Sequence, residues 1–292
     1  MKTMEKTHIR IGVKTMAPID KVWDYWNDPK HIVKWATGSF DWHTTKAEND
    51  LKAGGKFLSH MEAKDGSEGF DFVGKYTKIE KKRLIEYTID DGREVQTKFE
   101  SDGKNTTITQ TFEPEQLNSV ELQREGWQTI LDNFKHYAET AGRMETLHFE
   151  TTINASAEKV YNTMIGEKTY SEWTVEFNPT STFKGSWEKG AKILFLGDEP
   201  GAAVSGMVSR IKENIRNRYI SIEHVGFVKD GKEITSGPEL EKWSGMLENY
   251  MFTDRGGKTL VSVDMDSNDE FKSYLLRTWP KALIKLKSIC EK

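Results

Sequence analysis

The histidines are the residues best suited to acid–base or metal chemistry, and their spacing supports neither. No two of them form His-x-x-x-His or His-Glu-x-x-His, the patterns that place two zinc ligands on one helix face. We therefore expect no metal site. His43, in the run Asp41-Trp42-His43, is a candidate acid or base, but we interpret it as an ordered loop residue at the mouth of a pocket.

Other catalytic patterns are missing as well. The sequence contains no Gly-x-Ser-x-Gly nucleophile elbow, and Gly54-Gly55 precedes an expected strand, whereas a phosphate-binding glycine loop precedes a helix. The single cysteine, Cys290, has no second cysteine with which to form a disulfide or a redox pair. We expect no catalytic residue, no cofactor and no enzymatic activity.

Aromatic residues are the remaining chemical signal. They gather near residues 23–42 and on the strands that follow, and apolar pockets for small molecules are lined by such side chains. Each could equally belong to the core. The candidate ligand-binding residues are Trp23, Trp26, Trp35, Phe40, Trp42, His43, Phe57, Met61, Phe72, Tyr76, Trp127, Leu131, Trp173 and Trp279.

Charge and hydropathy exclude two classes of partner. The net charge is −4, and the longest basic run, Lys81-Lys82-Arg83, falls at an expected turn, so nucleic acid is an unsuitable partner. No apolar stretch reaches the ~18 residues that span a bilayer, and no signal-peptide core follows Met1. We expect a soluble, cytoplasmic protein with no membrane span.

An internal repeat organises these residues. The segment 17–23 matches the segment 155–161, and Trp35 matches Trp173 at the same offset. Gly74 is paired with Gly206 further on, and Trp127 with Trp279 near the end of each half. We expect two domains, a first copy at residues 1–142 and a second copy at residues 143–292.

The hydrophobic pattern of one copy predicts its elements. Residues 9–15 alternate as in a strand, Pro18 suits the first turn of a helix, and a second short helix follows Pro29. The apolar positions between residues 119 and 139 recur at helical spacing. Further strands are expected at 57–61, 70–79, 84–89, 95–99 and 106–112, separated by turn residues. The predicted class is α+β, a curved antiparallel sheet against a long helix.

The second copy differs from the first at Pro280, inside its expected last helix. Proline removes a backbone hydrogen bond and costs about 3 kcal/mol in a helix interior. Either one helix bends near Thr278, or a first helix ends at Arg277 and a new one begins with Pro280 in its first turn.

The chain resembles a known superfamily along most of its length. In the first copy the segments 41–43, 48–51, 54–57, 69–72 and 126–134 resemble START-like, Bet v 1-like (SRPBCC) domains homologous to the activator of heat shock protein 90 ATPase; in the second copy the segments 185–190, 206–211 and 221–224 do. The resemblance implies two helix-grip domains, each with a curved antiparallel sheet wrapped on a long C-terminal helix and an apolar cavity between them.

The superfamily includes several functions, which leaves three hypotheses open. The first is non-catalytic binding of a small hydrophobic or amphipathic molecule, such as a lipid. The second is a chaperone-associated or stress-response interaction module, although the eukaryotic activator carries a further amino-terminal domain that does not precede Met1 here. The third is a cyclase- or hydrolase-like enzyme. We expect the open cavity in the first copy, because it keeps Asp41-Trp42-His43 and Gly54-Gly55.

Overall fold

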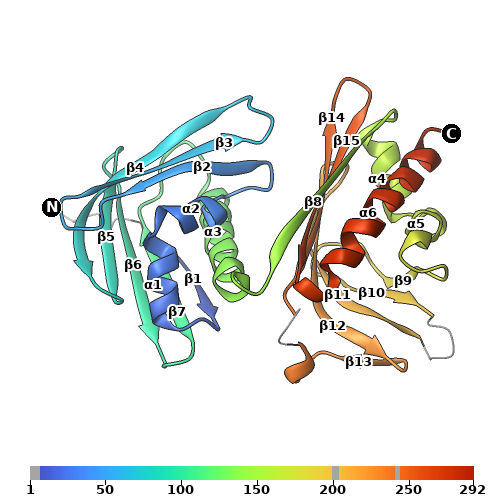
Figure 1. Cartoon of the computed structure of the whole chain (residues 1–292). Coiled ribbons are helices and arrows are strands. Elements are labelled where there is room, and N and C mark those ends of the chain that lie inside the picture. The colour runs from blue at the N-terminus through green and yellow to red at the C-terminus, as the bar shows by residue number, and fades with distance from the viewer. Residues whose placement is uncertain (1–6, 199–203, 241–243) are drawn as a thin grey trace. The chain divides into compact units, whose positions relative to one another are not determined.

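The computed structural model describes residues 7–198, 204–240 and 244–292. By its internal contacts the chain divides into Met1–Ala141 and Gly142–Lys292, which we call the first and second domains. Each contains an antiparallel sheet with a long C-terminal helix across one face and two short helices after its first strand (Figure 1). The predicted α+β class and the helix-grip architecture are confirmed.

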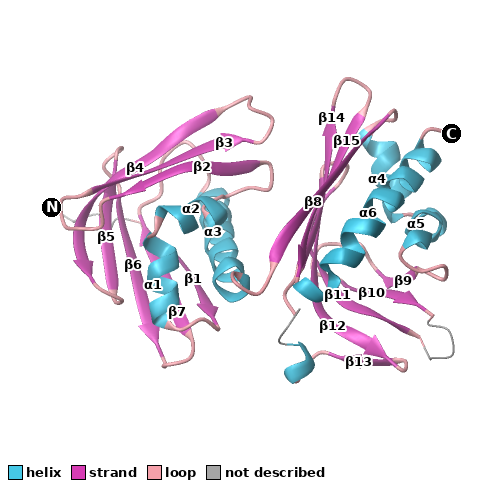
Figure 2. Ribbon diagram, in the orientation of Figure 1, coloured by secondary structure: helices cyan, strands magenta, loops and turns pink. Residues whose placement is uncertain are grey.

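The first domain follows the predicted order of elements. Its sheet has the strand order β1-β7-β6-β5-β4-β3-β2, so the first strand pairs with the last. Figure 2 shows its helices on one side of these strands. The elements are β1 (Ile9–Thr15), α1 (Ile19–Asn27), α2 (Pro29–Trp35), β2 (Trp42–Asn49), β3 (Lys56–Ala63), β4 (Gly69–Glu80), β5 (Leu84–Ile89), β6 (Glu94–Ser101), β7 (Thr106–Phe112) and α3 (Val120–Thr140).

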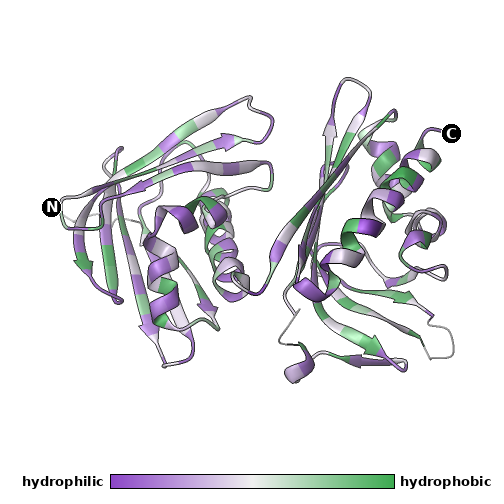
Figure 3. Ribbon diagram, in the orientation of Figure 1, coloured by the Kyte–Doolittle hydropathy of each residue, from purple (hydrophilic) through white to green (hydrophobic). Residues whose placement is uncertain are grey.

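Alternation of apolar and polar residues explains the strands. In β7 the residues Thr106, Ile108, Gln110 and Phe112 are buried, and the residues between them are only partly buried. Figure 3 shows the same alternation as green and purple along the strands. The buried face packs on α3, whose first turn is capped by Ser119. Apolar residues recur with a period of two in the strands and 3.6 in the helix, so each element has one apolar face. These two faces pack against each other.

One prediction for the first domain is wrong. We expected His43 in a loop, whereas Trp42–Asn49 forms strand β2 at the edge of the sheet. The segment reads Trp-His-Thr-Thr-Lys-Ala-Glu-Asn and has little apolar alternation, because only Thr44 in it is buried. A register shift between Thr44 and Lys46 further disturbs its period. An edge strand of this kind carries a weak hydrophobic signal.

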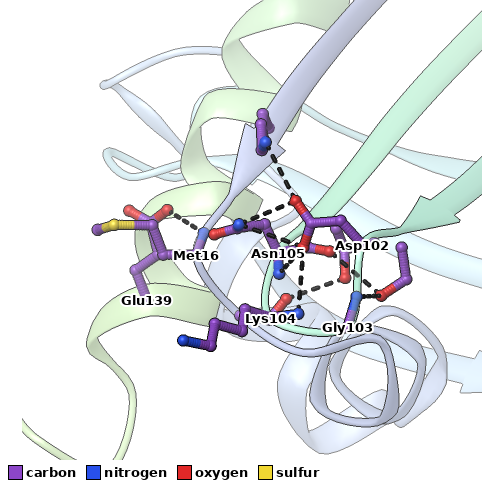
Figure 4. Close-up of polar contacts among 10 residues, drawn as sticks. Met16, Asp102, Gly103, Lys104, Asn105 and Glu139 are labelled. Carbon is purple, nitrogen blue, oxygen red and sulfur yellow. Dashed lines mark hydrogen bonds and ion pairs between the residues drawn. The ribbon is translucent and has the colours of Figure 1, made fainter.

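A carboxylate organises the turn between β6 and β7 (Figure 4). Asp102 accepts hydrogen bonds from the backbone N–H groups of Lys104 (3.1 Å) and Asn105 (2.7 Å) and lies 3.3 Å from the Lys14 ammonium. The Asn105 side chain, these backbone donors and Lys14 hold the pKa of Asp102 well below its ordinary value. In the same view, Met16 N–H donates to Glu139 Oε1 (2.8 Å), which ties the end of β1 to the end of α3.

The second domain repeats this arrangement with the strand order β8-β15-β14-β12-β11-β10-β9, and β13 pairs with β12. Its long helix α6 packs across β8, as Figure 1 shows. The elements are β8 (Glu145–Ile153), α4 (Ala157–Ile165), α5 (Glu167–Trp173), η1 (Thr174–Glu176), β9 (Thr182–Gly185), β10 (Lys192–Gly197), β11 (Ser205–Ile215), β12 (Tyr219–Lys229), β13 (Lys232–Ile234), η2 (Pro238–Leu240), β14 (Leu247–Asp254), β15 (Thr259–Ser267) and α6 (Asp269–Cys290).

Helix α6 runs through Pro280 without interruption, so the two-helix alternative is wrong. The residues before and after the proline fix the helix to the core: Trp279, Ala282 and Leu283 are all buried, and Asn268 caps the first turn. Their burial offsets the backbone hydrogen bond that Pro280 removes.

Candidate functional site

A cavity of about 540 Å³ lies in the second domain, between the sheet and α6. Its walls come from α5, η1, β10, β11, β12, β14, β15 and α6. Most of the lining is apolar, and aromatic rings dominate it. The lining aromatic residues are Tyr170, Trp173, Phe177, Phe195, Phe227, Tyr250, Phe271, Tyr274 and Trp279.

A bulge in β12 places two residues, one polar and one aromatic, on the same wall of the cavity. Ile220, Ile222 and His224 alternate along the strand and are buried on the cavity side. Ser209 pairs with His224 and Val208 with Gly226, so Val225 has no partner and the alternation shifts by one residue. As a result His224 and Phe227 both line the cavity, although their spacing would otherwise place them on opposite faces.

His224 is the centre of a buried chain of hydrogen bonds. Its Nδ1 lies 2.9 Å from Ser209 Oγ, and its Nε2 lies 3.2 Å from Glu248 Oε2. The other oxygen of Glu248 accepts a hydrogen bond from the Tyr250 hydroxyl. Ser209 is fully buried behind the wall, whereas His224, Glu248 and Tyr250 line the cavity. Three of the four groups in the chain of hydrogen bonds therefore border the cavity.

Burial fixes the proton on the tyrosines of this site. Desolvation raises the pKa of Tyr250 well above its ordinary value, and the Glu248 carboxylate raises it further. The same two causes raise the pKa of Tyr170, which also lines the cavity. Tyr250 is thus a neutral phenol that donates to Glu248. Both ring nitrogens of His224 already have partners, Ser209 and Glu248, so the Glu248 carboxylate is the member of the pair with lone pairs left for a guest.

A second carboxylate, Asp266, lines the cavity beside this chain. It is 7% exposed, and it accepts hydrogen bonds from the backbone N–H of Leu247 (3.0 Å) and the hydroxyl of Thr146 (2.9 Å). Both donors come from strands that flank β15. One buried carboxylate, one partly buried carboxylate and one imidazole make this a site for acid–base chemistry or for hydrogen-bonding a polar group.

Two of the residues predicted from the sequence meet in this cavity. Trp173 and Trp279 both line it, with ring centroids 6.0 Å apart. Trp279 Nε1–H points at the sulfur of Met265 (3.2 Å), and Trp173 Nε1–H donates to the carbonyl of Met164 (3.0 Å). Their polar atoms are satisfied within the domain, so their contribution to the cavity wall is apolar.

The other twelve predicted residues belong to the first domain. Nine of them form or contact its core, namely Trp23, Trp26, Trp35, Phe57, Met61, Phe72, Tyr76, Trp127 and Leu131. Within this core Trp127 stacks on Phe112, with centroids 4.1 Å apart, and meets Phe72 edge to face. Their role in binding a ligand stays a prediction.

The remaining three are partly buried and lie at or next to the start of β2. Trp42 packs on Phe70, and His43 Nε2 lies 3.1 Å from Glu62 Oε1; Phe40 precedes them in the chain. Glu62 also lies 3.5 Å from His60, whose Nδ1 lies 2.6 Å from Asp71. The hydrogen bond with Asp71 raises the pKa of His60 above its ordinary value. These contacts lie on the exposed part of the sheet.

The polar residues of the cavity were missed from the sequence. His224, Glu248, Tyr250 and Asp266 match no catalytic spacing. The alternation along two strands does point to these residues. In β12, His224 follows Ile220 and Ile222 on the face that points inward. In β14, Glu248 precedes Tyr250 and Phe252 on the inward face. A charged or polar residue at an inward position of a strand indicates a buried polar site. The expectation of an open first copy also missed this cavity, which the second copy holds.

Within residues 7–198, 204–240 and 244–292, no group of three or more histidine, cysteine, aspartate or glutamate residues has the geometry of a metal site. Across the same residues, no helix combines the length and apolar character needed to cross a membrane.

Two solved structures resemble the chain along nearly its whole length. They are the di-domain aromatase/cyclases StfQ, from the steffimycin biosynthetic pathway (12% identity, TM-score 0.42, 97% of each chain covered), and BexL, from the BE-7585A biosynthetic pathway (11% identity, TM-score 0.40, covering 98% of this chain and 97% of that one). Both are named as enzymes, which contradicts the expectation that this chain is not one, and we withdraw that expectation. The likeness assigns no reaction to this chain.

Comparison with curated proteins gives no match. Two single-domain structures are more similar in sequence. The AHSA1-like protein from Aeromonas hydrophila is 45% identical (TM-score 0.43, covering 46% of this chain and 94% of that one), and Chr148 from Cytophaga hutchinsonii is 52% identical (TM-score 0.41, covering 45% and 92%). The family model described as Activator of Hsp90 ATPase homolog 1-like protein matches residues 16–139. With this match and these identities, the chain belongs to the AHSA1-like family, as the resemblance in its sequence indicated.

Proposed function

We propose that the second domain binds a small amphipathic molecule in the cavity between its sheet and α6. The observation that carries this proposal is an aromatic cavity of about 540 Å³ with one polar end, formed by His224 and Glu248. Pockets for small molecules in proteins measure about 300–1,000 Å³ and combine an apolar lining with a few polar groups that orient the guest. The cavity fits this description in size and in chemistry.

The position of the polar groups supports a defined orientation of the guest. His224 and Glu248 come from adjacent strands and hold each other in place at 3.2 Å. Met207, Met246 and Met265 line the cavity as well, and methionine side chains adapt to irregular shapes. An apolar body would lie among the rings and methionines, and its polar group would meet the His224–Glu248 pair.

Occlusion of the cavity tests this proposal. In the full chain Met207→Trp should fill part of the space, and Met16→Trp, at a residue that is 75% exposed in the first domain, is a matched control. We expect a naphthalene-based fluorescent probe to bind the unmodified chain and the control, and to bind Met207→Trp at least about tenfold more weakly. Equal binding to all three proteins would place the probe elsewhere and count against the proposal.

A second candidate function is acid–base catalysis on the bound molecule. The specific observation is the chain from Ser209 through His224 and Glu248 to Tyr250, which can hold and pass a proton beside a guest. Glu248 would accept a proton from a carbon next to a carbonyl group, the carbonyl oxygen would take the negative charge of the enolate, and return of the proton would restore the ketone.

This candidate has a direct test. A bicyclic ketone such as 2-tetralone, kept in D₂O with the full chain, would exchange its acidic C–H hydrogens for deuterium, which mass spectrometry detects. We expect Glu248→Gln to reduce any acceleration by about 100-fold or more, the lower end of the usual contribution of a general base. Exchange at the same rate with and without protein would exclude this activity for this class of ketone.

A further inference from the structure

The fixed charges in the described part of the cavity wall are all negative. Among the described residues that line it, the acidic ones are Glu248 and Asp266, the one imidazole is His224, and neither lysine nor arginine is present. The wall therefore carries a charge of −2 when His224 is neutral and −1 when it is protonated, provided that both carboxyl groups are ionised. In neither state does it offer a guest a net positive charge.

The hydrogen bonds of the two carboxylates suit their ionised forms. Asp266 accepts from a backbone N–H, which can only donate, and from the hydroxyl of Thr146. Glu248 accepts from Tyr250, whose raised pKa keeps its proton in place. A carboxylate oxygen has two lone pairs, so each oxygen of Glu248 can accept one more hydrogen bond. A donor on the guest can use the remaining lone pair, whereas an acceptor cannot.

The aromatic part of the wall also favours a cation. Ring faces carry negative electrostatic potential, and an ammonium group within about 6 Å of a ring centroid is attracted to it. Of the lining rings, Trp173 and Trp279 are 1% exposed, whereas Phe177, with its centroid 5.0 Å from that of Trp279, is partly exposed and can present its ring to a cation. A guest carboxylate, by contrast, would lose its hydration and meet two like charges, with neither lysine nor arginine among the described lining residues to offset them.

We propose that the guest of the second domain is an amphipathic organic cation, an amine or quaternary ammonium group on an apolar, ring-sized body. This inference rests on the proposed binding function and specifies its ligand class. The proposal predicts binding of organic cations and weak binding of fatty acids and other anionic lipids, which would otherwise suit the same apolar cavity.

Three molecules with one skeleton test the charge preference. 2-Naphthylmethylamine, 2-naphthalenemethanol and 2-naphthoate differ chiefly in their polar group, and calorimetry at neutral pH compares their binding to the full chain. We expect the amine to bind about tenfold more tightly than the alcohol, and the naphthoate to bind most weakly. Equal affinities, or tightest binding of the naphthoate, would overturn the cation proposal and leave the binding function standing.

Two variants test whether the preference for the amine comes from the carboxylates of the cavity. Glu248→Gln and Asp266→Asn each remove the charge while keeping the size of the side chain and one of its two acceptor oxygens, and each should reduce the preference for the amine several-fold. Glu223→Gln is the matched control, because Glu223 lies on the neighbouring strand and pairs with Arg210 outside the cavity wall. A preference unchanged in both Glu248→Gln and Asp266→Asn would overturn the proposal. If none of the three molecules binds, the binding function fails together with this inference.

Discussion

The two domains share a fold. They differ at the strand positions that form the polar wall of the cavity in the second domain. Hairpins β4–β5 and β11–β12 have turns of equal length and a bulge at the same distance from the turn. Residues at the same distance from the turn are therefore equivalent in the two domains. Where the second domain has Ser209, His224 and Glu248, the first has Gly74, Ile89 and Val95. The first domain thus has no counterpart of the buried chain of hydrogen bonds.

The apolar walls differ in the same region. Phe112 of the first domain occupies the ladder position of Met265, and Phe72 that of Met207. Trp127 lies between Phe112 and Phe72, with its ring stacked on the former. Three rings therefore pack together in the first domain at positions where the second has two methionines beside its cavity.

Truncation of a packed ring should give the largest effect. Phe112→Ala removes a ring that is 1% exposed and stacked on Trp127, and we expect a loss of about 4 kcal/mol in the free energy of unfolding of the first domain. Met265→Ala, at the same ladder position, should cost the second domain only about 1–2 kcal/mol, because the side chain already borders empty space. Urea-dependent hydrogen exchange of each domain in the full chain measures both; equal losses would refute the contrast.

Replacement of His224 should have the next largest effect. His224→Ile introduces the residue of the first domain but leaves Glu248 buried without its imidazole partner, which should destabilise the second domain by about 3 kcal/mol. The combined variant Ser209→Gly, His224→Ile, Glu248→Val and Tyr250→Phe removes the whole chain of hydrogen bonds. We expect it to recover most of that stability, as seen in hydrogen exchange of β12 and β14. A combined variant less stable than His224→Ile would show that the network itself stabilises the fold.

The sequence predicted the fold well because both copies repeat strong periodic patterns. Strands β5 and β7 have the predicted bounds Leu84–Ile89 and Thr106–Phe112, since turn residues flank each of them. The sequence comparison matched Gly74 with Gly206, which is three residues away from the equivalent position. In the structure Gly74 occupies the hairpin position that Ser209 occupies in the second domain. Both glycines allow a close approach, Gly74 to the Phe57 ring and Gly206 to the Phe195 carbonyl, and this common constraint produced the misleading match.

The site was harder to predict because it depends on contacts between strands. Ser209, His224 and Glu248 are far apart in the sequence and meet only when β11, β12 and β14 pair. The bulge at Val225, which brings Phe227 onto the same wall as His224, leaves no mark in composition or spacing. Trp173 and Trp279 were found because an aromatic residue is conspicuous in any sequence, whereas a single histidine or glutamate in a strand is not.

The smallest expected effect concerns the turns that close the last hairpin of each domain. Asp102 accepts bonds from two backbone N–H groups and the Asn105 side chain (Figure 4), whereas Asp254 in the second domain accepts one, from the N–H of Gly257 at 3.1 Å. At neutral pH we expect Asp102→Ala to lower the midpoint of thermal unfolding of the first domain, and Asp254→Ala to lower that of the second domain less. Asp102 is exposed, so the effect should be modest.

The pH dependence of this effect identifies its cause. Because the pKa of Asp102 in the folded protein lies below the ordinary value of 3.8, its ionised form stabilises the fold fully above that value. As the pH falls below 3.8 the unfolded chain takes up the proton first, and the stabilisation is lost progressively toward the folded pKa. The difference between the unmodified chain and Asp102→Ala should therefore be constant from neutral pH down to about pH 5 and shrink below about pH 4. A difference that stays constant through pH 3 would mean that the carboxylate charge is not what stabilises the turn.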